Sequence, residues 1–292
     1  MQSTSSPADE SNGVSLESQK AALAFSSTGP NNRTVQSIAA QNTECRSCSI
    51  NPWTVGRYLG CIITGLIIGG ALANYAIYNI APHPEHQIAD VLKRFDLGHE
   101  PSIPAFYSAI VMLFAAATAA FLSVYDGDPA NKRRTSWRIL SFVLVLLAID
   151  EVVMFHEMGT AAMEQLGLSG KLYFSWVIPG GIFAAVVAIS FTKLLINLGW
   201  RTRLLFLASG AIFVSGAIGM ELLAGIIFAS AESELVALSS VAHVLSQAVE
   251  EGLEMIGMAL FLCTLLDFIN LQGISVWVAK KTADEQESLD AK

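Results

Sequence analysis

Seven carboxylate side chains lie inside or at the edge of apolar segments that are long enough to cross a membrane, and no Lys or Arg lies among them. An ionised carboxylate near the centre of a membrane-spanning helix costs about 2.5–3.5 kcal/mol on insertion scales. A chain that keeps several of them must protonate them, hydrate them or bind cations with them, so these positions mark the candidate site. They are Asp150, Glu151, Glu157, Glu221, Glu250, Glu251 and Glu254.

The composition is that of an integral, multi-pass membrane protein. Of the 292 residues, 53% are hydrophobic and only 14% are charged, and the mean hydropathy is +0.51. A soluble domain needs more polar surface than this. The net charge of -8 comes without a clustered basic face, which argues against a nucleic-acid partner and leaves the lipid bilayer as the expected one.

The segmentation predicts an all-α fold, a bundle of six transmembrane helices. Residues 1–50 are rich in Ser, Asn, Gln and Thr and lack apolar periodicity, which is typical of a disordered tail. The transmembrane domain is expected at residues 51–273 and a second tail at 274–292. A span needs about 20 mostly apolar residues. The segments that meet this requirement are residues 56–80, 104–125, 136–158, 171–198, 202–229 and 239–270.

The distribution of Lys and Arg predicts the orientation of these spans. Cytoplasmic connections carry an excess of basic residues, and such residues precede the first span and fill the second and fourth connections and the segment after the last span. They are Arg46, Arg57, Lys132, Arg133, Arg134, Arg138, Lys193, Arg201, Arg203, Lys280 and Lys281. The other side has only Lys93, Arg94 and Lys171. Both termini are therefore expected in the cytoplasm, and the candidate site nearer the non-cytoplasmic face.

The four cysteines give little evidence of a metal or disulfide framework. Cys61 and Cys263 lie in predicted spans, where Cys is ordinarily a small buried apolar residue. Cys45 and Cys48 form a C-x-x-C pair in the tail. This pair supplies half of the four ligands that a structural zinc ion needs, and the chain has no second pair.

The acidic residues of different spans are expected at similar depths. With a rise of 1.5 Å per residue, Asp150 and Glu221 lie about 12 Å, and Glu250 about 16 Å, below the outer ends of their helices. Helical phase sorts them further. The residues that share one direction of the sixth span are His243, Gln247, Glu250 and Glu254, and in the third span Asp150 and Glu157 share one direction, whereas Glu151 and Glu251 point to the side.

Carboxylates together with imidazoles are a ligand mixture that suits iron, manganese or zinc, in a site with one metal ion or two. The sequence therefore predicts a membrane metalloprotein, an oxidoreductase that acts on a lipid-soluble small molecule. None of these helices has the Glu-x-x-His spacing of di-metal helical bundles. The expected ligands are Asp150, His156, Glu157, Glu221, His243, Glu250 and Glu254, supported by Glu151, Gln247 and Glu251.

Three other functions fit the same residues. In a transporter for protons or divalent cations, the acids would exchange ions along a path, and a kink at Pro179 would act as a hinge. In a haem b protein, His156 and His243 would be the two axial ligands, since their depths are similar. In a structural subunit, the acids would be protonated and paired.

Overall fold

The computed structural model describes residues 46–47, 50–79, 87–98, 101–128, 132–156, 158–160, 175–274 and 277–278. The chain divides into two compact units. In the unit formed by residues 1–48 and 276–292, strand β1 (Arg46–Ser47) pairs in antiparallel fashion with β2 (Trp277–Val278). The other residues of the predicted N-terminal tail up to residue 49, with Cys45 and Cys48, lie outside the described residues. Residues 275–276 and 279–292 of the second predicted tail lie outside them too.

The unit formed by residues 49–275 is a helical bundle. Four stretches of helix in its described part are long and apolar enough to cross a membrane, as expected of an integral membrane protein. They are Pro52–Tyr78, Ile103–Tyr125, Trp200–Ser230 and Val241–Leu271. The first two correspond to α3 (Pro52–Asn79) and α5 (Ile103–Tyr125), and the last is α13 (Val241–Leu271).

The two other expected spans are less regular. Helix α6 (Arg134–Val153) has Arg residues near its start and Asp150 and Glu151 near its end. The fourth segment divides into α8 (Val177–Ser190), whose 14 residues extend about 21 Å, and α9 (Thr192–Ile196). Pro179 lies in the first turn of α8, which begins at Val177, and not in a helix interior as the predicted kink requires, so that prediction is wrong for the described residues.

The fifth segment contains a π-helix that the sequence pattern did not predict. Helix α10 (Trp200–Val214) continues into the π-helix η1 (Ser215–Met220) and then into α11 (Glu221–Ser230). A π-helical turn adds one residue to the turn and rotates everything beyond it, and such turns are frequent at functional sites. Glu221 is the first residue after this turn.

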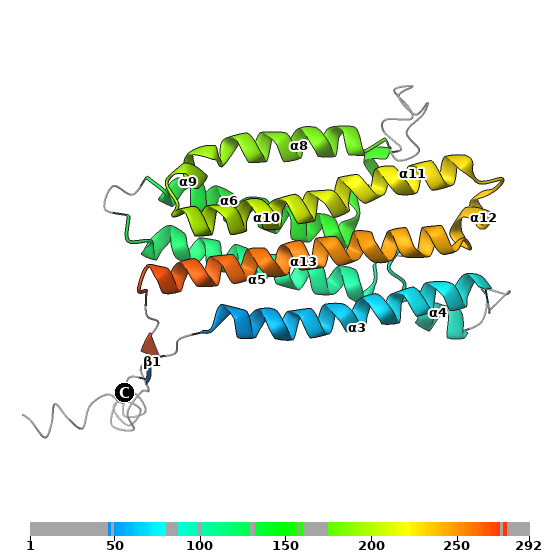
Figure 1. Cartoon of the computed structure of the whole chain (residues 1–292), viewed down its shortest axis with the longest axis horizontal. Coiled ribbons are helices and arrows are strands. Elements are labelled where there is room, and N and C mark those ends of the chain that lie inside the picture. Colours follow the sequence, from blue (N-terminus) through cyan, green and yellow to red (C-terminus); the bar gives the residue numbers. More distant parts are fainter. Residues whose placement is uncertain are drawn as a thin grey trace, which may run out of the picture. The chain divides into compact units, whose positions relative to one another are not determined.

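Helix α13 forms the centre of the bundle, with α3 on one side and α10, η1 and α11 on the other, and it also packs on α5 (Figure 1). Its first turn is capped by Ser240, whose hydroxyl accepts a hydrogen bond of 3.1 Å from the backbone N–H of His243. The short helices α4 (Gln87–Lys93) and α12 (Glu234–Leu238) precede α5 and α13.

Helices α5 and α6 pack closely along their length because α5 presents small side chains to the core. Ala115 and Ala119 are fully buried, and they belong to the same core cluster as Leu144 of α6. Small residues let helix backbones approach closely in a lipid environment, where hydrophobic association is weak. Beyond the core, large apolar side chains such as Tyr58 and Ile189 are 70% and 74% exposed, as lipid contact requires.

A buried ion pair joins the connected ends of α5 and α6. Arg133 donates from Nε to Oδ2 of Asp126 at 2.8 Å and from Nη2 to Oδ1 at 2.6 Å. The indole N–H of Trp137, which is fully buried, donates to the same carboxylate at 2.7 Å.

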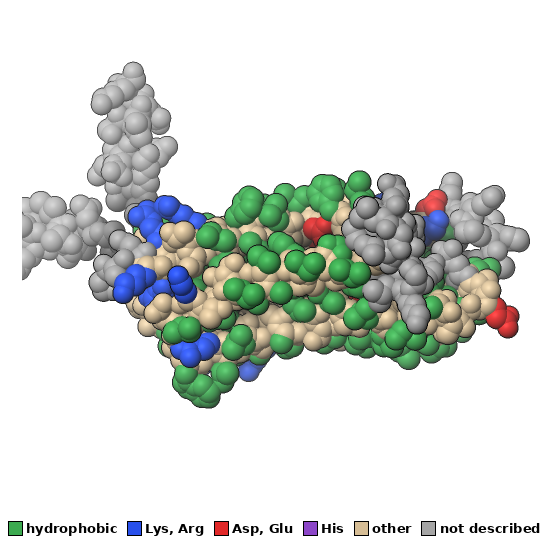
Figure 2. Space-filling model, turned by 90° about the horizontal axis from the view of Figure 1, so that it is seen from above, with side chains coloured by type: hydrophobic (Ala, Val, Ile, Leu, Met, Phe, Trp, Pro, Cys, Tyr) green, Lys and Arg blue, Asp and Glu red, His purple; other side chains and the backbone are tan. Residues whose placement is uncertain are grey.

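Lys and Arg side chains gather at one end of the bundle (Figure 2). Exposed basic residues near the first helix start and in the connections after α5 and α8 are Arg57, Lys132, Arg134, Arg138, Lys193 and Arg201, and Arg94 is exposed in the connection after α4.

Candidate functional site

A cavity of about 1300 Å³ lies among α6, α8, α10, η1 and α13. Most of its wall is apolar, and α6 and α13 contribute to its two sides. Leu144 and Leu147 of α6 line one side, and Met258 and Phe261 of α13 line the other. Helix α8, whose side chains are mostly exposed, contributes Val187 to the wall. Ligand-binding pockets in proteins are commonly about 300–1000 Å³, so the volume of this cavity is at or above the upper end of what such pockets have.

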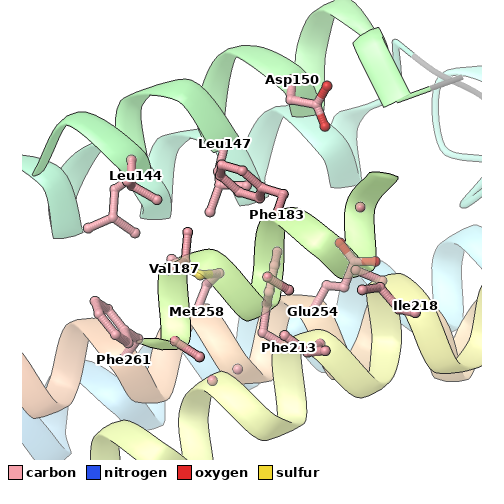
Figure 3. A pocket seen from close by; sticks show the side chains of 18 of the residues that line it. Leu144, Leu147, Asp150, Phe183, Val187, Phe213, Ile218, Glu254, Met258 and Phe261 are labelled. Carbon is pink, nitrogen blue, oxygen red and sulfur yellow. The ribbon is translucent and has the colours of Figure 1, made fainter. Parts of the chain in front are cut away.

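The ionisable residues that line the cavity in the described part of the chain are six carboxylates and one imidazole. In Figure 3, Asp150 and Glu254 lie toward one end of the cavity, and Leu144, Val187 and Phe261 lie away from that end. The cavity is therefore divided into an acidic end and an apolar end. The ionisable lining residues are Asp150, Glu151, His156, Glu221, Glu250, Glu251 and Glu254.

Asp150 and His156 are held together by the way α6 ends. Met154, directly after the helix, has a left-handed backbone conformation with φ 60, and its N–H donates to the carbonyl of Asp150 at 2.7 Å. The chain turns back as a result. The backbone N–H of His156 then donates to Oδ1 of Asp150, and Nδ1 of its ring lies 3.1 Å from Oδ2. One carboxylate thus fixes both the backbone and the ring of His156.

Trp176, at the start of α8, connects His156 with Glu221. Its ring centroid lies 5.0 Å from that of His156, and its Nε1–H donates to Oε1 of Glu221 at 3.1 Å. A Cβ at Gly180 would lie 2.6 Å from the Trp176 ring, so only glycine leaves room for the ring there. These contacts join the end of α6, the start of α8 and the start of α11 at the acidic end of the cavity.

Glu250 and Glu254 reach the cavity from α13, and they pack against the π-helix. A Cβ on Gly216 of η1 would lie 2.8 Å from both the carbonyl oxygen of Glu250 and Cγ of Glu254. Gly216 therefore allows the two helices to approach each other at the site. Glu151, 8% exposed, lines the same cavity beside Glu251, and the two carboxylates interact electrostatically.

His243 and Gln247 belong to a different polar cluster. Asn74 of α3 donates from Nδ2 to Oδ1 of Asp96 at 2.8 Å and to Oε1 of Gln247 at 3.2 Å. His243 is 3% exposed, interacts electrostatically with Asp96 and packs edge-on against Phe228. Neither residue lines the cavity. The polar stripe expected on α13 is thus divided between two places, because its first two members face α3 and the segment after α4.

Comparison with protein families matches residues 60–268 to the model described as "Domain of unknown function (DUF8692)". The chain belongs to the DUF8692 family. The match includes every residue that lines the cavity of this DUF8692 protein. No curated protein and no solved structure matches the chain.

In the DUF8692 chain, the cavity brings together most of the residues expected at the site. Glu157 lies outside the described residues. As the side chains are placed, the described His, Cys, Asp and Glu residues include no group of three that could hold a metal ion. Only one of the two histidines expected to bind haem lines the cavity. The expected site residues on its wall are Asp150, His156, Glu221, Glu250 and Glu254, and the supporting residues Glu151 and Glu251 lie there too.

Sequence reasoning missed the role of Trp176 in the DUF8692 site, because a Trp near the end of a span is usually an interfacial anchor. The signal that could have identified it is Gly180, four residues later and therefore one helical turn away on the same face. The Asp150–His156 pair is chemically a carboxylate that orients an imidazole, an arrangement that suits proton transfer.

Proposed function

We propose that this DUF8692 protein is an integral membrane protein that binds a lipid-soluble molecule in the cavity. Residues at the acidic end of the cavity exchange protons with the polar end of that molecule. The observation that carries the proposal is the division of one large cavity into an apolar end and an acidic end. An apolar chain gains free energy when its surface leaves water or a polar interface, and convergent polar groups fix the orientation of a bound molecule.

The Asp150–His156 pair is proposed as the proton-exchanging group. With a proton on Nδ1 donated to Asp150, Nε2 becomes the basic nitrogen of His156. The carboxylate also stabilises the imidazolium that forms when Nε2 accepts a proton. Since the ring packs against Trp176, its orientation is restricted on a second side.

We also propose six spans with both termini on the cytoplasmic side, in which α6 and the α8–α9 segment cross with the four longer helices. The gathering of Lys and Arg at one end of the bundle supports this topology (Figure 2). It places the acidic end of the cavity toward the non-cytoplasmic face. A reporter cysteine at Glu232 should be labelled from the side opposite to one at Lys132. Labelling of both positions from the same side would contradict the topology.

The binding proposal is tested with a photoactivatable neutral lipid, a long-chain alcohol with a diazirine on its chain, incorporated into nanodiscs that contain the protein. We expect cross-links at Leu144, Leu147 and Met258. A Val187→Trp substitution fills the apolar end and should remove these cross-links. Ile189→Trp, on the same helix but 74% exposed, is the matched control and should leave them unchanged. Equal labelling in both variants would contradict the proposal.

A metal-dependent oxidoreductase that acts on the same lipid-soluble molecule is the second candidate. It is supported by the convergence of six carboxylates and His156 on one cavity, a set of donors that suits iron, manganese or zinc. Side-chain rotation would be needed to bring three of them around one ion. Metal analysis of the purified protein tests this candidate, and cation or proton flux in liposomes without bound metal would favour a transporter instead.

A further inference from the structure

The charge on the cavity wall restricts the class of molecule that fits it. The described lining residues include six carboxylates and one histidine, and no Lys or Arg is among them. An anionic head group at this end would meet like charges in a region of low dielectric, where repulsion is stronger than in water. A cationic head group would be attracted by the same charges, and its presence would favour the ionised carboxylates.

The aromatic group at the acidic end favours the same class. Trp176 lines the cavity there, held by its hydrogen bond to Glu221 and its contact with His156. The face of an indole ring attracts cations more strongly than that of any other aromatic side chain. A carboxylate beside an indole therefore provides two kinds of attraction for an ammonium group.

The apolar end of the cavity indicates that the rest of the bound molecule is apolar. Residues of α6, α8, α10 and α13 continue the cavity beyond the acids, and the labelled side chains of Figure 3 at that end are aliphatic or aromatic, with Met258 among them. A small hydrophilic cation would leave this part of the cavity without an occupant. A long hydrocarbon chain would give this part of the cavity an apolar occupant.

We propose that the cavity binds a cationic amphiphile, a long-chain amine whose ammonium group lies among Glu221, Glu250, Glu254 and Trp176 and whose chain lies along Leu144, Val187 and Phe261. This inference rests on the proposed function, since it names the class of lipid-soluble molecule that the cavity takes.

The test is a competition among three amphiphiles of equal chain length in nanodiscs of zwitterionic lipid. Hexadecylamine, hexadecanol and hexadecanoate each compete with the neutral photoactivatable alcohol for cross-linking at Leu147 and Met258. We expect hexadecylamine to compete about 10-fold better than hexadecanoate, which corresponds to a modest electrostatic preference. Hexadecanol should lie between them.

Matched variants show whether the preference comes from the cavity. The double variant Glu250→Gln and Glu254→Gln should reduce the preference for the amine, and so should Trp176→Phe. Glu232→Gln, which removes an exposed carboxylate outside the cavity, controls for the attraction of amines to the surface and should keep it. The single variant Glu254→Gln is used if the double variant does not fold.

The outcomes separate the two proposals. If hexadecanoate competes as well as hexadecylamine, or if the cavity variants keep the full preference, the cationic class is wrong, although the neutral probe still marks a binding cavity. If the neutral probe gives no cross-link at Leu147 or Met258 in the wild type, the proposed function itself is wrong.

Discussion

The carboxylate of Asp150 accepts the backbone N–H of His156 at Oδ1, and its Oδ2 lies 3.1 Å from Nδ1 of the His156 ring. The two residues are six positions apart in the chain, and a regular α-helix would place them on different faces. The left-handed conformation of Met154 ends the helix between them. The site therefore depends on a backbone conformation that residues other than glycine rarely adopt.

Substitutions of Met154 test this dependence. In the left-handed region a residue with a Cβ is strained by roughly 1–2 kcal/mol, and a β-branched residue by more. Met154→Gly should therefore change the free energy of unfolding by only about 1 kcal/mol, because relief of strain offsets the added flexibility of the unfolded chain. Met154→Val should destabilise the protein clearly. Thermal unfolding in detergent measures both, and equal melting temperatures for the two variants would contradict the role of the left-handed turn.

The Trp176 ring gives a second prediction, with a control in the next residue. A Cβ at Gly180 would lie 2.6 Å from the ring, whereas a Cβ at Gly181 would meet nothing within 4 Å. Gly180→Ala should displace Trp176 and weaken its hydrogen bond to Glu221. Gly181→Ala should be neutral or stabilising by up to about 1 kcal/mol, because Ala favours helix. Tryptophan fluorescence and melting temperature report the difference, and a stable Gly180→Ala variant with unchanged fluorescence would be the opposite result.

The sequence predicted the membrane class and singled out several residues that line the cavity, because burial of acids in apolar segments is unfavourable enough to be conspicuous. It could not predict the division of the α13 stripe, since helical phase shows which residues share a face and not which neighbour that face meets. Asn74 and Asp96 come from distant parts of the chain and decide where His243 and Gln247 lie. The π-helix at 215–220 likewise has no local pattern, and it changes the phase of Glu221.

The ion pair at the connection between α5 and α6 should contribute strongly to stability. Asp126 and Arg133 have side chains that are 4% and 14% exposed, and their pairing is bidentate. Removal of one partner of a buried pair leaves a charge uncompensated and typically costs about 3–5 kcal/mol. Asp126→Asn should therefore lower the melting temperature by a large amount, and it also weakens the acceptor for Trp137.

The control for this prediction is a second ion pair at the surface. Lys93 and Asp90 lie 3.7 Å apart with side chains that are 35% and 72% exposed. Pairs of this kind contribute about 0–1 kcal/mol, so Asp90→Asn should leave the melting temperature nearly unchanged. A similar small effect of both substitutions would mean that the buried pair does not hold the two helices together.

The two polar clusters on α13 should respond differently to substitution. Asn74→Ala removes the donor to Asp96 and Gln247 and leaves buried acceptors without it, which should cost about 1–3 kcal/mol. Because this cluster does not line the cavity, cross-linking of the neutral probe and any bound metal should be unchanged in the variant that still folds. His243→Ala should behave in the same way. Glu254 lies on the cavity wall. Glu254→Gln should therefore change the binding of the lipid-soluble molecule or of metal, with a smaller loss of stability. If His243→Ala instead abolished metal content or probe cross-linking as Glu254→Gln does, the two clusters would act as one site, as helical phase alone had predicted.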